Sequence, residues 1–127
     1  MMTNNIEPFD KLVVMRQLVW SCIFENNKTI GVVLPNYESV KKFKNDLMQV
    51  MSEVPNWLLQ LKIANTRNVQ SANNVSVRLF NTVLGMRGTT LNLVYIADDL
   101  NKKQYDEFVV SMIPTLRGGS IISFLNT

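Results

Sequence analysis

Two adjacent aspartates, Asp98 and Asp99, follow the apolar run at residues 93–96. An acid at the end of a buried strand in a parallel sheet can hold Mg²⁺ beside a nucleotide phosphate, because carboxylate oxygens are hard ligands. Successive strand side chains diverge, so we expect one carboxylate to face the crevice above the sheet and the other to face solvent. The alternative is that Asp98 or Asp99 caps the loop and the helix that follows it. Residue types alone leave both interpretations open.

A phosphate-binding loop is missing from the sequence. A P-loop needs GxxxxGK[ST] between a strand and a helix. The nearest segment, CIFENNKT (22–29), has Cys22 and Asn27 where glycines are required, and it runs from an expected helix into a strand. We therefore interpret Lys28 and Thr29 as turn residues. The chain has no histidine and one cysteine, which excludes His-dependent triads, disulfide frameworks and Cys/His zinc sites.

The positive charge is unevenly distributed. The net charge is only +3, yet the stretch from Val54 to Ala97 contains no acid. Its four cations are Lys62, Arg67, Arg78 and Arg87. Such a stretch can contact nucleic-acid phosphates, so these are the candidate nucleic-acid residues. The alternative is an ordinary solvated surface.

The first half of the chain predicts two helices around a buried strand. Residues 9–25 have helical spacing with Asp10 as N-cap, and TIGVVLP (29–35) is a continuous apolar run typical of a strand covered on both faces. A second helix follows Asn36 and ends before Pro55. The apolar faces expected for the two helices are Leu12, Val13, Val19, Trp20, Ile23 and Phe24, then Val40, Phe43, Leu47, Met51 and Val54.

The second half predicts further strands and a third helix. NWLLQLKIAN predicts a helical turn and then a strand, and residues 74–81 alternate, with Val75, Val77 and Leu79 on one face. A loop through Gly85 and Gly88 leads to the strand LNLVYIA. The third helix, KKQYDEFVVSMI, has Tyr105, Phe108, Val109, Met112 and Ile113 on its apolar face. A Gly118–Gly119 turn then enters the last strand, SIISFL.

Helices alternating with short apolar strands predict an α/β fold of three layers, with a mostly parallel sheet and helices on both faces. We expect residues 1–127 to form a single domain, since 46% of them are apolar and no linker or repeat interrupts the chain. No apolar run reaches the ~18 to 20 residues that cross a bilayer, and the polar start is unlike a signal peptide. We therefore expect an intracellular protein that does not act on membranes.

From Thr29 onward, the motifs resemble the ATPase domain of viral large terminases, which drive DNA into phage and herpesvirus capsids. TIGVVLPNYESVKKFKNDLMQVMSEVPNWL resembles that family's strand and long helix after the P-loop helix. MRGTTLNLVYIADDL resembles its Arg-Gly followed by the Walker B strand, and IPTLRGGSIISFLNT resembles the helix end, turn and strand before the coupling motif. The resemblance implies a RecA-like, P-loop NTPase-like core.

The same resemblance exposes departures from the family pattern. Counted from Arg87-Gly88, the two Walker B acids fall on Ala97 and Asp98, and only a one-residue slip places them on Asp98 and Asp99. MRQLVWS (15–21) resembles the approach to the P-loop, with Val19, Trp20 and Ser21 in place of Gly-Lys-Thr. No segment resembles the family's nuclease domain. Both Walker motifs are therefore degenerate.

The sequence leaves three functional hypotheses, two of which follow from the resemblance. The first is a terminase-like core without catalysis, with no cofactor, that binds a protein of virion assembly or DNA packaging, or DNA itself. The second is an ATPase completed by another chain, with ATP and Mg²⁺ bound, Asp98 as catalytic acid, Asp98 and Asp99 as metal ligands and Arg87 as a phosphate contact. The third is an unrelated α/β binding module. Under the first two, we expect the host cytoplasm for a phage protein or the nucleus for a protein of a eukaryotic virus.

Overall fold

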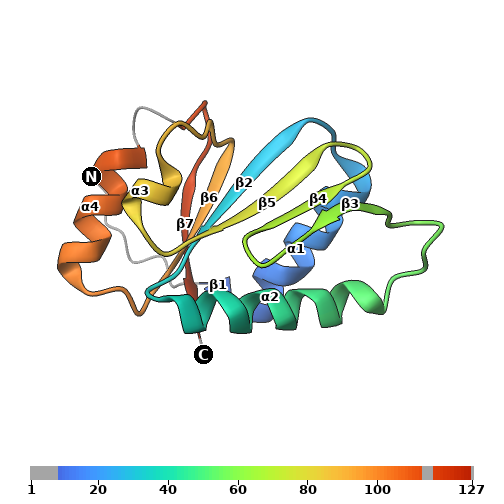
Figure 1. The fold of residues 1–127 in the computed structure, drawn as a ribbon, viewed down its shortest axis with the longest axis horizontal. Helices are drawn as coiled ribbons and strands as arrows, with labels where there is room; N and C mark the ends of the chain where they lie inside the picture. The colour runs from blue at the N-terminus through green and yellow to red at the C-terminus, as the bar shows by residue number, and fades with distance from the viewer. Residues whose placement is uncertain (1–8, 113–115, 127) are drawn as a thin grey trace.

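The computed structural model describes residues 9–112 and 116–126. The described strands form one seven-stranded sheet in the order β1-β7-β6-β2-β5-β4-β3 (Figure 1). In chain order the elements are β1 (Phe9–Asp10), α1 (Lys11–Phe24), β2 (Lys28–Val33), α2 (Tyr37–Ser52), β3 (Leu61–Ala64), β4 (Asn68–Ser71), β5 (Val75–Phe80), α3 (Val83–Met86), β6 (Leu93–Ala97), α4 (Lys102–Met112) and β7 (Ile121–Leu125).

The sheet is mostly parallel, as the sequence predicts. β1, β7, β6, β2 and β5 pair in parallel with their neighbours, so their carboxyl ends lie along one edge, called here the carboxyl edge. Among the described strands only β4 and β3 are antiparallel, and they extend the sheet beyond β5. The sequence predicts β3 but misses β4, because NVQS is short, polar and only half-buried.

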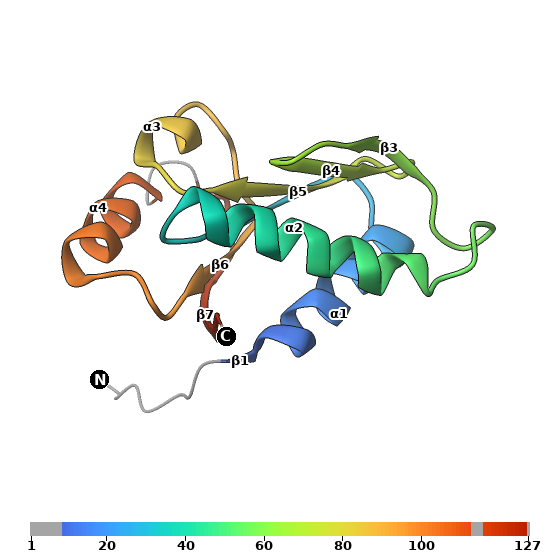
Figure 2. The same ribbon diagram turned by 60° about the horizontal axis from the view of Figure 1, so that its bottom comes forward.

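Helices cover both faces of the sheet, which confirms the predicted three layers. α1 and α2 pack on one face and bury the larger core around Phe43, Leu47 and Phe124. α3 and α4 pack on the other face around Phe80, Phe108 and Met112. Figure 2 shows α3 and α4 at one end of the sheet and the β3–β4 hairpin at the other. No helix in the described part of the chain is long and apolar enough to span a bilayer.

α2 follows its sequence pattern closely. The Asn36 side-chain oxygen accepts a hydrogen bond from the Ser39 N–H at 2.9 Å, so Asn36 is the N-cap as predicted. Val40, Phe43, Leu47 and Met51 are the buried residues of the helix. A clean stripe of this kind fixes which face turns toward the sheet.

The predicted apolar face of α1 is mostly wrong. Asp10 is the N-cap, as expected, but Leu12, Val13, Trp20 and Phe24 are 41–61% exposed. Val19 is buried as predicted and Ile23 packs partly against the core, but the other buried apolar residues of the helix are Val14, Met15, Leu18 and Cys22. Apolar residues occur on nearly every side of α1, so spacing alone cannot identify the buried face. The exposed Trp20 and Phe24 rings pack on each other, with centroids 5.3 Å apart.

Two smaller differences concern the second half of the chain. The loop through Gly85 contains the short helix α3, which the sequence does not predict. In α4, Phe108 and Met112 are buried as expected, whereas Tyr105 is 43% exposed and Ile113 lies outside the described residues.

Candidate functional site at the carboxyl edge

Asp98 and Asp99 form a turn directly after β6, called here the acidic turn, and both are exposed. The Asp98 N–H continues the sheet ladder by donating to the Phe124 carbonyl at 2.9 Å. Asp98 Oδ1 accepts the Asn126 N–H at 3.1 Å, and the Asn126 side-chain amide donates to both Asp99 oxygens at 3.1 and 3.3 Å. The two carboxylates therefore converge on one residue after β7, and do not point apart as we expected.

Neither aspartate caps α4. The Asn101 side chain accepts the Gln104 N–H at 2.8 Å, and the Gln104 side chain accepts the Asn101 N–H at 3.1 Å. This reciprocal pair is a capping box. Gln104 also donates to the Pro35 carbonyl at 3.0 Å, which holds α4 against the end of β2. The acidic turn is thus free of a helix-capping role.

The acidic turn offers few ligands for a metal ion. In the described residues, no group of three or more His, Cys, Asp or Glu side chains is arranged to hold one. Ala97, the last residue of β6, is 2% exposed and has no ligand atom in its side chain. Asp98 and Asp99 supply carboxylates, but both are already hydrogen-bonded to Asn126.

The first strand enters its helix with no intervening loop. β1 ends at Asp10, beside Leu125 of β7, and α1 begins at Lys11. Asp10 Oδ1 accepts the Leu12 N–H at 2.9 Å. The N-terminus of a helix attracts anions through its free N–H groups and dipole, and here the chain's own carboxylate occupies that position.

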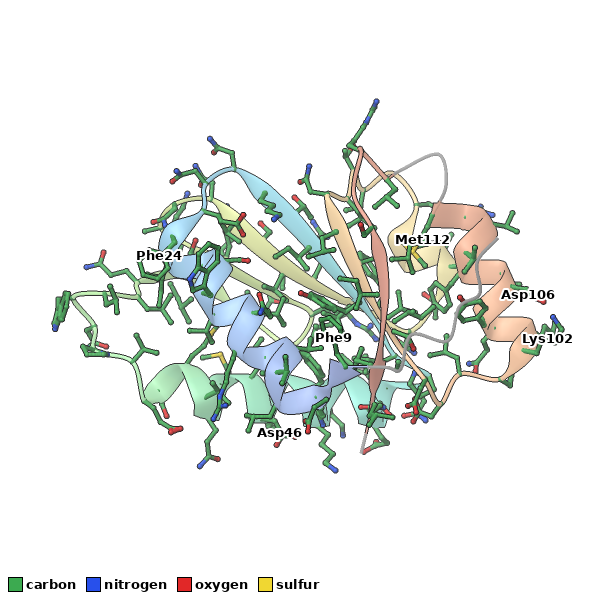
Figure 3. All side chains as sticks on the ribbon, turned by 180° about the vertical axis from the view of Figure 1, so that it is seen from behind. Phe9, Phe24, Asp46, Lys102, Asp106 and Met112 are labelled. Carbon is green, nitrogen blue, oxygen red and sulfur yellow. The ribbon has the colours of Figure 1, made fainter. Side chains whose placement is uncertain are left out.

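Lys11, which nothing in the sequence pattern singles out, lies at this junction and is buried. Its Nζ is 3.0 Å from Asp46 Oδ2 of α2 and 5.7 Å from the centroid of the Phe43 ring. Figure 3 shows Asp46 on α2 beneath α1. The Lys11 charge is thus directed into the contact between the two helices, where a cavity of about 300 Å³ lies beside it.

The segments that resemble P-loop pieces lie elsewhere. Residues 15–21 are inside α1, more than a helical turn beyond the strand end, so they do not lead into a helix as the approach to a P-loop must. Lys28 is not a turn residue, because it begins β2 and pairs with Glu25 at 3.0 Å. A hydrogen bond from Ser21 lowers the pKa of Glu25, burial opposes this, and Lys28 lowers the pKa further.

The four predicted basic residues do not form one patch. Arg87 is the C-cap of α3 and lines a cavity of about 530 Å³ together with the acids Asp106 and Glu107. Lys62 lies on β3 and donates to the Asn74 side-chain oxygen at 2.9 Å. Arg87 is therefore in a mixed-charge setting and lines a different cavity from Arg67 and Arg78.

Arg67 and Arg78 do come together. Arg67 precedes β4, Arg78 lies in β5, and both line a cavity of about 210 Å³ with Asn81, Thr82 and Gly85. We call these five residues the arginine pocket. It lies at the end of β5, on the same carboxyl edge as the acidic turn and two strands away, or about 10 Å. Spacing in the sequence cannot reveal this pair, because the antiparallel register of β4 and β5 creates it.

Solved phage proteins share this fold. The large terminase ATPase domain of Thermus phage P74-26 matches with a TM-score of 0.70 and 11% identity, over 91% of this chain and 54% of that one. The large terminase of a second, thermophilic bacteriophage matches with a TM-score of 0.62 and 9% identity, over 87% of this chain and 29% of that one. The structure of that second terminase in complex with ADP matches with a TM-score of 0.60 and 10% identity, over 87% of this chain and 28% of that one.

This chain spans about half of the P74-26 ATPase domain and less than a third of the second phage's terminase. The sequence matches no family model and no curated protein. At such low identity the comparison concerns the fold, and it agrees with the predicted RecA-like, P-loop NTPase-like architecture. The chain therefore has the fold of the ATPase domain of phage large terminases.

Proposed function

We propose that this chain is a terminase-like core domain of a viral DNA-packaging system that does not hydrolyse ATP by itself. It acts by binding a partner, either DNA or a protein of virion assembly. The fold similarity supports the packaging role. The observation that carries the loss of catalysis is the β1–α1 junction, where Asp10 caps the helix and no phosphate loop intervenes.

Electrostatics at this junction disfavour a nucleotide. A triphosphate at the start of α1 would meet the Asp10 carboxylate in place of a cradle of free N–H groups. The nearest lysine, Lys11, is already paired with Asp46 at 3.0 Å. For Lys11 to reach the phosphates, a half-buried ion pair would have to break, and the triphosphate would also face the Asp10 carboxylate; both steps cost free energy.

The acidic turn does not compensate for this loss. Phosphoryl transfer depends on positioned cations and donors that stabilise charge on the transferred group. Ala97 stands where the resemblance expects the Mg²⁺ ligand, and the Asp98 and Asp99 carboxylates are engaged by Asn126. The residues present therefore do not fit ATP with Mg²⁺, and we propose that this chain alone uses no cofactor.

The direct test is ATP hydrolysis by the purified chain, measured with and without double-stranded DNA. We expect phosphate release no faster than in a protein-free control. A variant that removes both carboxylates of the acidic turn, Asp98→Asn/Asp99→Asn, should release phosphate at the same rate as the unmodified chain. Turnover that is stimulated by DNA and lost in this variant would overturn the proposal.

A second function is favoured by one observation, the coverage of only 54% of the P74-26 ATPase domain. Such a chain can be one part of an ATPase that another polypeptide completes. Asp98 would then be the catalytic acid, Asp98 and Asp99 the metal ligands, and Arg87 a phosphate contact. Hydrolysis that appears only when a second viral protein is added, and that requires Asp98, would support this alternative.

A further inference from the structure

We propose that the arginine pocket binds a backbone phosphate of nucleic acid. This inference rests on the DNA partner in the proposed function and assigns the contact to one place, at the end of β5. It concerns a different part of the carboxyl edge from the acidic turn and the β1–α1 junction, and it requires no catalysis.

The first arginine of the pocket is held in a fixed orientation. The Arg67 guanidinium donates to the Asn81 side-chain oxygen at 2.7 Å and lies 5.2 Å from the centroid of the Tyr37 ring. The backbone carbonyl of Arg67 accepts the Leu79 N–H at 2.9 Å, and this hydrogen bond links the Arg67 backbone to β5. A planar guanidinium held in this way loses little conformational entropy when it binds an oxyanion.

The second arginine has no counterion. Arg78 is half-buried in β5, and in the described part of the chain its guanidinium makes no hydrogen bond or ion pair. A partly desolvated cation is costly to leave unpaired, and an anion in the pocket would offset that cost. Glu38, which follows the Tyr37 that Arg67 contacts, already pairs with Lys41 at 3.3 Å.

The pocket has other polar groups besides the two arginines. The Thr82 hydroxyl accepts the Gly85 N–H at 3.1 Å, so its own proton is available to donate to a ligand. Guanidinium groups suit phosphate because their paired N–H donors match two phosphate oxygens. Two arginines and a hydroxyl around a small cavity therefore favour an oxyanion such as a phosphate group over a neutral ligand.

The surface beside the pocket favours a polymer as the source of that phosphate. Arg78 shares a sheet face with Ser76, and their partners in β4 are Asn68 and Gln70. α3 borders the pocket at the end of β5. On the side away from α3, this half-exposed polar face continues toward β3, where Lys62 is found (Figure 2). These strands carry no acid, as a surface that follows a nucleic-acid backbone requires.

The experiment compares the full chain with Arg78→Gln, Arg78→Lys and the control Arg16→Gln, an exposed arginine on α1 with the same change of charge. Fluorescence anisotropy measures affinity for a labelled single- or double-stranded oligonucleotide over a range of salt. We expect Arg78→Gln to weaken binding about tenfold or more and to lower the salt slope by about 1. Arg78→Lys should recover part of the affinity, and Arg16→Gln should change little.

A second measurement on the unmodified chain does not depend on variant folding. Amide NMR signals of Asn81, Thr82 and Gly85 are followed while the oligonucleotide or inorganic phosphate is added. Saturable shifts with the oligonucleotide support the inference. If inorganic phosphate shifts these signals and the oligonucleotide does not, the pocket binds a free phosphate ion and the inference of a nucleic-acid phosphate is wrong.

Two further outcomes separate the inference from the proposed function. If the chain binds DNA but Arg78→Gln and Arg16→Gln bind it equally well, the arginine pocket is not the contact, and DNA remains the partner of the proposed function. If neither DNA nor phosphate binds, the pocket and the DNA partner are both wrong, and the protein partner of the proposed function remains.

Discussion

At the scale of single residues, the chemistry of this chain depends on which charges are already paired. Asp98, Asp99 and Lys11 look reactive in a list of side chains, yet each is held by a neighbour, Asn126 or Asp46. Arg78 looks ordinary and is a charge left without a partner in the described structure. The sequence identifies the acidic turn and both arginines, but their partners come from other strands and cannot be read from local spacing.

Gly119 is a residue whose small size the sheet requires. A Cβ atom at this position would collide with the Asn92 carbonyl, which is backbone and cannot move aside. We expect Gly119→Ala to lower the free energy of unfolding by about 2 kcal/mol or more, because β7 must shift away from β6. Urea unfolding of this variant beside Ser120→Ala, an exposed neighbour, measures the effect. Equal stability of the two variants would contradict the close approach.

Cys22 should be chemically inert in the folded chain. The thiol is 1% exposed, and burial raises its pKa to about 11. We expect no reaction with a thiol reagent such as DTNB at about pH 8, where a free cysteine is partly thiolate, and full reaction in denaturant. Labelling of the native protein at the rate of a free thiol would show that α1 does not pack on the sheet as described.

At the scale of elements, a helix could be predicted well from the sequence when one of its sides was apolar and the other polar. α2 has one apolar and one polar side, so its boundaries, cap and buried residues were predictable. α1 is apolar almost all round, and only the tertiary contacts with α2 and the sheet decide that Val14 and Leu18 are inside. β4 and α3 have four residues each, too few for periodicity to reveal them, and β4 is also mostly polar.

The cap of α1 has a measurable contribution. Replacing Asp10 by alanine removes the acceptor for the Leu12 N–H and the favourable charge at the helix start. We expect the free energy of unfolding to fall by about 1 kcal/mol, as measured by chemical denaturation. Asp10→Asn should retain most of the stability, since asparagine also caps. If Asp10→Ala is as stable as the unmodified chain, Asp10 does not cap the helix.

The turn from α1 to β2 should respond to pH through Glu25. Its folded-state pKa lies below the usual 4.5, first through Ser21 and, against the opposing effect of burial, also through Lys28. A lowered folded pKa stabilises the fold above the unfolded pKa, and this contribution is lost as pH falls through the folded value.

We therefore expect Glu25→Gln to destabilise the chain at neutral pH by no more than about 1 kcal/mol, and less as the pH drops below the usual value. Unfolding curves across this pH range test it, with Glu38→Gln as the more exposed control. A difference between Glu25→Gln and the unmodified chain that grows in acid would have the wrong sign.

At the scale of the whole molecule, the fold and the site carry different information. The order of elements predicts an α/β core, and the motifs after Thr29 resemble those of terminase ATPase domains; the solved phage structures share this fold at 9–11% identity. At the β1–α1 junction, the sequence predicts the helix and its Asp10 cap but not β1, because a two-residue strand has no periodicity to reveal it. Under the proposed function, the chain keeps this fold while the Asp10 cap stands at the helix start in place of a phosphate site.

Calorimetric titration of the full chain with ATP and Mg²⁺ tests the central claim most directly. We predict no saturable heat up to about 1 mM nucleotide, because Asp10 occupies the start of α1 and Lys11 is paired with Asp46. One-to-one binding with a Kd well below that concentration would contradict the claim and restore the chain to the class of nucleotide-binding motors.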